Sequence, residues 1–149
     1  MKADHVIEKL NEAVSLEFGA FHMYLQFSLL VHGQDRIKWH EFFEKQSNEA
    51  LGHAKLFGAK IVARGGVPTV QPASFKQAQD LDEMLELALE TEKRAVQLYT
   101  KIHGMVEGHD KPLQYLLEQQ IQDEQDDVEE IEQFLRRTKL HALRVAHAA

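Results

Sequence analysis

The sequence predicts an all-α protein, a four-helix bundle in which two antiparallel helical hairpins are joined by one long crossover. Apolar residues recur at alternating spacings of three and four along four long segments, a pattern typical of helices with one buried face. Only three prolines and eight glycines occur in the 149 residues, so long helices can form. This length fits one domain, residues 1–149, with a continuous apolar core.

The four predicted helices cover about residues 4–32, 35–64, 80–108 and 112–137. Asp4 suits the N-cap of the first helix, and Gly33 suits the position that follows its last turn. Pro112 falls in the first turn of the fourth helix, where its missing N–H costs nothing. The sequence leaves open whether the tail, residues 138–149, extends the fourth helix or forms a short helix of its own.

The connections set the order of the helices in the bundle. The first and third connections are short, so each joins an antiparallel pair. The second connection, residues 65–79, reads GGVPTVQPASFKQAQ and reaches roughly 50 Å when extended. Because each helix is roughly 40 Å long, this link can travel the whole bundle and start the third helix beside the start of the second.

The composition excludes several classes of function. A formal net charge of -7 argues against a general affinity for nucleic acid, which needs basic stripes. Because there is no cysteine, any metal must be held by the nine histidines or the 24 acidic residues, which are hard or borderline ligands. No apolar run approaches the roughly 20 residues that span a bilayer, and the start of the chain lacks a signal-peptide core. We therefore expect a cytoplasmic protein with no membrane or nucleic-acid partner.

Ionisable side chains occupy the central places of the apolar stripes. Glu17 lies in the middle of the first stripe, Glu92 in the middle of the third and Glu124 in the middle of the fourth. His53 is the polar member of the second stripe. Asp127 follows Glu124 by three residues and shares its helix face. All four helices therefore direct a polar group into the core, near the midpoint of each helix.

A single buried glutamate could be ion-paired, or its helix could be rotated. Four such groups at one level are harder to explain, because an unpaired buried carboxylate costs several kcal/mol and tends to take up a proton. No lysine or arginine lies on these stripes, so one or two divalent cations are the predicted counter-charge. Tyr24 and Tyr99 are expected in the core, where either hydroxyl could hydrogen-bond a metal-bound carboxylate.

On these residues the chain resembles the ferritin-like diiron proteins, most closely the bacterioferritins, along residues 5–137. That family carries a lone glutamate on the first and third helices and Glu-x-x-His on the second and fourth. The matches are Glu17 in SLEFGAFHMYLQFS, His53 in NEALGHAKLFGAKIVARGGVP, Glu92 in ETEKRAVQLY and Glu124 in DEQDD. The resemblance implies a ferritin-like four-helix bundle with a dinuclear iron site inside the subunit.

Three positions depart from the family pattern. The family's bridging glutamate, three residues before His53, is replaced by Ala50, and the histidine of the fourth helix is replaced by Asp127. Aspartate is itself a good hard ligand, whereas the first change removes a bridge between the metals. Glu49 either substitutes for that bridge, through a slight helix rotation or a π-bulge, or lines an inner surface beside a weakened site. Leu51 stands where haem-binding bacterioferritins carry the axial methionine, so no haem is expected.

The resemblance implies a ferritin function, in which a homo-oligomeric cage binds Fe(II), oxidises it with O₂ or H₂O₂ at the dinuclear site and stores the iron. The residues expected to carry the oxidation are Glu17, His53, Glu92 and Glu124. The expected metal ligands are Glu17, Glu49, His53, Glu92, Glu124 and Asp127.

Two alternatives stay open. A rubrerythrin-like diiron oxidase or peroxidase would act as a dimer and store no iron. A non-catalytic metal-binding bundle would result if Ala50 leaves the site short of a bridging ligand. Other divalent metals, the size of the oligomer and the formation of a mineral core also stay open.

Overall fold

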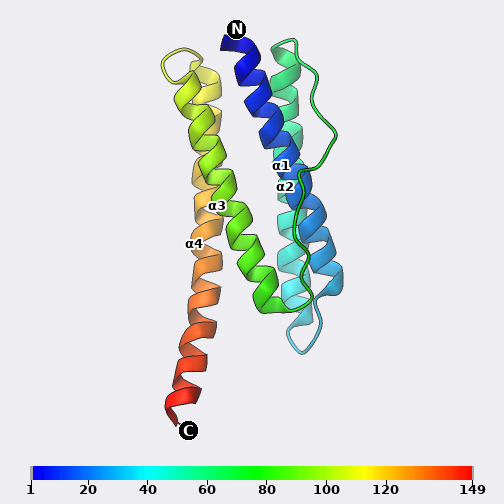
Figure 1. Cartoon of the computed structure of the whole chain (residues 1–149), viewed down its shortest axis with the longest axis vertical. Helices are drawn as coiled ribbons and strands as arrows, with labels where there is room; N and C mark the ends of the chain where they lie inside the picture. The colour runs from blue at the N-terminus through cyan, green and yellow to red at the C-terminus, as the bar shows by residue number, and fades with distance from the viewer. Residues whose placement is uncertain (1, 149) are drawn as a thin grey trace.

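The chain folds into four long helices, shown in Figure 1. A computed structural model describes the backbone of residues 2–148 and the side chains of residues 3–136. The helices are α1 (Lys2–Leu30), α2 (Arg36–Ala63), α3 (Leu81–Val106) and α4 (Lys111–Ala148). Over the described residues, no helix combines the length and apolar character that a membrane crossing requires.

The predicted helix bounds agree with the structure to within one or two residues, except at the end of the fourth helix. There α4 runs through the tail to Ala148, so the tail extends this helix. Asp80 caps α3, because its side chain accepts a hydrogen bond from the backbone N–H of Glu83 at 3.0 Å. Asp4 lies within the first turn of α1 instead of capping it.

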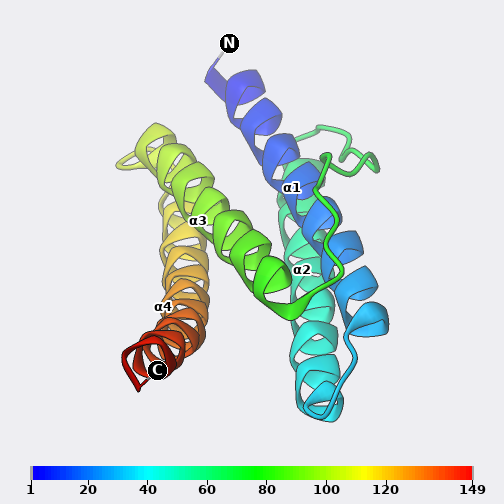
Figure 2. The same cartoon turned by 60° about the horizontal axis from the view of Figure 1, so that its bottom comes forward.

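The helices pair as two antiparallel hairpins, α1 with α2 and α3 with α4, and both views keep this arrangement (Figures 1 and 2). The crossover, residues 64–80, runs along α1 and brings the chain back to the end where α2 began (Figure 1). Ala73 donates its backbone N–H to Ser15 O at 2.8 Å. At this point only a glycine fits, because a Cβ on Gly19 would lie 2.7 Å from the Ala73 carbonyl oxygen. The predicted all-α topology with one long crossover is confirmed.

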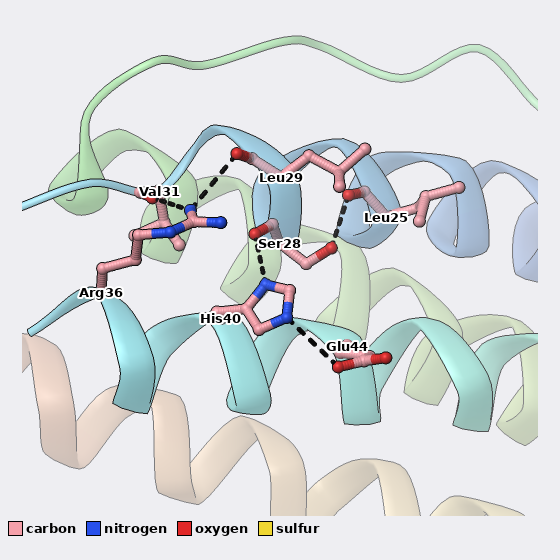
Figure 3. A network of polar contacts seen from close by, with 7 residues as sticks. All are labelled: Leu25, Ser28, Leu29, Val31, Arg36, His40 and Glu44. Atoms are coloured by element: carbon pink, nitrogen blue, oxygen red, sulfur yellow. Dashed lines mark hydrogen bonds and ion pairs between the residues drawn. The ribbon is translucent and has the colours of Figure 1, made fainter.

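The turn between α1 and α2 is held by two side chains of α2 that bind carbonyl groups at the end of α1 (Figure 3). His40 Nδ1 lies 2.7 Å from Ser28 O. Arg36 donates to Leu29 O at 3.3 Å and also to Val31 O. The last carbonyls of a helix have no partner within the helix, so these contacts satisfy acceptors that would otherwise depend on water.

We expect Arg36→Ala to lower the free energy of unfolding by about 1–2 kcal/mol, because two carbonyl groups lose a charged donor. Urea denaturation of the metal-free protein measures the change. Arg94→Ala is the matched control, since among the described side chains Arg94 pairs with Glu90, in an exposed contact whose loss should cost about 0.5 kcal/mol or less. Equal losses in the two variants would contradict the role given to Arg36.

The described side chains form two separate apolar clusters, one on each side of the bundle's middle. The first cluster includes Phe27, Phe43, Leu85 and Ile131. The second includes Leu10, Phe57, Ile102 and Leu113. In every helix, the predicted polar site residue falls near the boundary between the positions that feed the two clusters. The fold thus places four ionisable groups at one level, enclosed by apolar packing above and below.

Candidate metal centre

The structure brings five of the six predicted metal ligands together. Glu17, His53 and Glu124 form one group, and Glu92, Glu124 and Asp127 form a second. In each group one ligand atom from every residue lies within 4.8 Å of the others. Glu124 belongs to both groups, so its two carboxylate oxygens can serve two ions at once.

The three glutamates are almost completely removed from water. Glu17 is 3% exposed, Glu92 is 5% exposed and Glu124 is 2% exposed. The ion pairs found among the described residues give these carboxylates a single cationic neighbour, His53. Several negative charges around one imidazole leave an excess that a bound metal ion would neutralise.

The His53 ring nitrogen faces two carboxylates without a hydrogen-bond geometry. Its Nδ1 atom lies 2.8 Å from a Glu124 oxygen and 3.7 Å from a Glu17 oxygen. Nevertheless this buried nitrogen has no aligned hydrogen-bond partner among the described residues. Once His53 loses its proton, its nitrogen and the two carboxylates present converging donor atoms of the kind that a cation-binding site requires.

Burial and the closeness of the ionisable groups to one another shift the pKa values of this cluster. Burial acts to lower the pKa of His53, but the neighbouring Glu124 and Glu17 carboxylates outweigh it and raise this pKa to about 11. Burial raises the pKa of Glu17 and of Glu124. Burial and a hydrogen bond with Glu124 raise the pKa of Glu92 well above its ordinary value. Burial, followed by the charges of Glu92 and Glu49, raises the pKa of Asp127 to about 7. Raised pKa values favour the protonated forms of these groups, so a metal ion that bound here would compete with protons.

Two buried tyrosines hold the carboxylates in place by a reciprocal arrangement. Tyr24 donates its hydroxyl proton to Glu92, and Tyr99 donates its hydroxyl proton to Glu17. Each tyrosine follows the glutamate of its own helix by seven residues and binds the glutamate of the other hairpin. Both tyrosines lie in the core, as expected, and each hydroxyl hydrogen-bonds one of the buried carboxylates. Such outer partners fix the orientation of a ligand oxygen before the ion arrives.

The sixth predicted ligand, Glu49, belongs to neither group. Its side chain is 40% exposed, and its carboxylate pairs with Lys45 Nζ at 3.7 Å. Ala50, at the family's bridging position, is buried in the first apolar cluster. The substitution of Glu49 for the missing bridge stays a prediction.

Gln46 is a site residue that sequence reasoning missed. It is 3% exposed, and its side chain hydrogen-bonds Asp127 and so acts to lower the pKa of that carboxyl. The available signal was its place on the apolar stripe of α2, two turns before His53, where a polar residue needs a buried partner.

The site is accessible from one side. Glu49, Asp123 and Asp126 line a pocket together with His53 and Asp127. These residues come from α2 and α4, so cations can reach the ligands between these two helices. The acidic rim would concentrate cations at this opening.

A family model described as the ferritin-like domain matches residues 7–141. The chain belongs to the ferritin-like family. No curated protein sequence matches it. The match covers α2 and α3 completely, most of α1 and α4, and the five residues that the structure brings together.

Solved ferritin-like structures are similar over most of the chain. A ferritin-like, diiron-carboxylate protein from Bacillus anthracis is 34% identical, with a TM-score of 0.88 over 91% of this chain and 98% of that one. A bacterioferritin from Rhodobacter capsulatus, with haem iron and a metal-free dinuclear site, is 25% identical, with a TM-score of 0.82 over 91% and 86% of the two chains. A dodecameric thioferritin from Bacteroides fragilis is 22% identical, with a TM-score of 0.85 over 97% and 90%, and supports the fold alone.

Proposed function

We propose that this ferritin-like protein binds two Fe(II) ions at Glu17, His53, Glu92, Glu124 and Asp127, oxidises them, and stores the iron in a homo-oligomeric shell. The observation that carries this proposal is the pair of ligand groups that share Glu124, one of Glu17, His53 and Glu124 and the other of Glu92, Glu124 and Asp127. The four negative charges would balance the four positive charges of two Fe(II) ions. The diiron-carboxylate relative from Bacillus anthracis supports the same assignment.

The residues of the site favour oxidation of the bound substrate ions. Anionic oxygen ligands stabilise Fe(III) more than Fe(II), which lowers the reduction potential and makes electron loss favourable. Two Fe(II) ions each give up one electron, and O₂ accepts both electrons together with two protons to form H₂O₂. Glu124 would hold the two ions near each other, while Tyr24 and Tyr99 keep Glu92 and Glu17 in place. The chain supplies binding, orientation and an access route.

Aerobic addition of Fe(II) to the metal-free protein tests this function. We expect near-ultraviolet absorbance of ferric species to appear faster than in buffer alone, and light scattering to report a particle of many subunits. A dimer that still oxidises Fe(II) would favour an oxidase or peroxidase without storage. Oxidation no faster than in buffer would remove both catalytic readings.

A non-catalytic metal-binding bundle is the second candidate, and the burial of Ala50 favours it. With no carboxylate at this position, Glu124 is the one acidic residue that the two groups share. With fewer bridging carboxylates, two metal ions would be bound less tightly and would be held less close to each other.

We expect Ala50→Glu to speed aerobic Fe(II) oxidation by about tenfold, because it restores the carboxylate that the family pattern has at this buried position. Stopped-flow absorbance measures the rate. Ala50→Gln is the control, since it adds nearly the same volume to the apolar cluster without a charge. An unchanged rate in Ala50→Glu, with two ions bound, would show that the native site lacks nothing at this position.

A further inference from the structure

The two halves of the proposed centre offer different donor atoms. Besides the shared Glu124, one half has a carboxylate and an imidazole, from Glu17 and His53. The other half has two carboxylates, from Glu92 and Asp127. Within the described part of the chain, His53 is the one histidine in either group. The second half is therefore made of oxygen donors alone and carries one more negative charge than the first.

The surroundings increase this difference. The His53 Nδ1 atom is buried and points at the Glu124 and Glu17 carboxylates, at 2.8 and 3.7 Å, so an ion at this nitrogen would also meet both carboxylates. Asp127 is partly exposed, hydrogen-bonds Gln46 and lines the acidic pocket beside Asp123 and Asp126. An ion held there can keep water molecules as further oxygen ligands. One half resembles a site for borderline transition metals, and the other resembles a site for harder cations.

We propose that the two halves bind ions of different hardness: a borderline ion such as Zn(II) or Fe(II) at Glu17 and His53, and a harder ion such as Mn(II) at Glu92 and Asp127. The proposal rests on the dinuclear function proposed above, because both halves belong to that centre. Imidazole strengthens binding of borderline ions, whereas carboxylates and water suit Mn(II). Because Ala50 provides no bridging carboxylate, Glu124 is the one ligand that the two halves share among the described residues, and each half can follow its own preference.

Competition between two metals tests this assignment. Crystals of the metal-free full chain, soaked with one equivalent each of Zn(II) and Mn(II), would be measured at the absorption edges of both metals. We expect a zinc peak beside His53 and a manganese peak between Glu92 and Asp127. In Asp127→His, both halves contain an imidazole, so the one equivalent of zinc should divide between them and the manganese occupancy of the second half should fall by about half.

Asp127→Asn separates charge from shape, because it keeps the side-chain size and removes the negative charge. We expect it to lose manganese and to retain zinc at His53. An equal mixture of zinc and manganese in both halves of the wild-type protein would overturn the inference while leaving the dinuclear centre intact. No bound metal in either half would overturn the proposed function itself. The wild-type crystal decides between these outcomes even if a variant does not fold.

Discussion

Glu124→Gln is expected to weaken the binding of both metal ions by about 100-fold or more, a larger loss than for any other single ligand. Glu124 is the residue that belongs to both ligand groups, whereas Glu17 and Glu92 each belong to one. Its side chain is 2% exposed, so packing against its neighbours holds it between the two groups. Glutamine keeps the volume of the side chain but removes the charge, and its amide is a much weaker metal ligand.

Anaerobic calorimetric titration with Fe(II) measures this effect, and aerobic oxidation should be lost in parallel. Glu17→Gln should weaken the binding of one ion and leave the other bound, because Glu17 belongs to one ligand group. This difference distinguishes a ligand shared by both groups from a ligand of one group. Glu129→Gln is the matched control, because Glu129 is an exposed residue on the same helix. Two ions bound with near wild-type affinity in Glu124→Gln would show that Glu124 does not bridge the halves.

The metal-free protein is expected to lose stability as the pH rises from 5 to 8, and bound metal should reverse this trend. The pKa of Asp127 is raised from 3.8 to about 7 by burial and by nearby carboxylates. A group whose pKa is higher in the folded state stabilises the fold below its unfolded pKa, and this contribution is lost as the pH rises through the folded pKa. Asp127 therefore loses its contribution between about pH 4 and pH 7.

His53 also stabilises the folded protein less as the pH rises, over a higher pH range than Asp127. Its pKa is raised from 6.5 to about 11 by Glu124 and Glu17, which outweigh burial, so its contribution declines from pH 6.5 upward. The opposite case, a carboxyl with a lowered pKa, is represented by Asp110 and Glu118. The contributions of these two carboxyls to the stability of the fold grow with pH only up to about pH 4.5, and they no longer change above pH 5. We therefore expect the free energy of unfolding of the metal-free protein to fall between pH 5 and pH 8.

Thermal unfolding of the metal-free protein should show a midpoint about 5 °C lower at pH 8 than at pH 5. Bound metal keeps its ligands deprotonated, so the stabilisation by metal should grow as the pH rises. Asp127→Asn should flatten the metal-free profile between pH 5 and pH 7. A midpoint that rises from pH 5 to pH 8 without metal would contradict the crowding of buried carboxylates on which this expectation depends.

The helical period by itself determined which carboxylates are buried. Glu17, Glu92 and Glu124 fall on apolar stripes, and an α-helix repeats every 3.6 residues, so any helix that buries its stripe also buries these groups. The length and prolines of the crossover likewise determined that the second hairpin starts beside the beginning of α2. These features depend on local geometry and chain length, which a sequence contains in full.

The tertiary structure alone decided that Glu124 belongs to both ligand groups and which polar side chain of α2 faces the metal centre. Glu49 and Gln46 lie within one turn of each other, yet Gln46 is buried against Asp127 and Glu49 turns toward Lys45. The rotation of α2 about its axis makes this choice, and packing of Phe43 and Phe57 in two different clusters sets that rotation. Contacts between helices are set by all four chain segments at once, so no periodicity within one helix can reveal them.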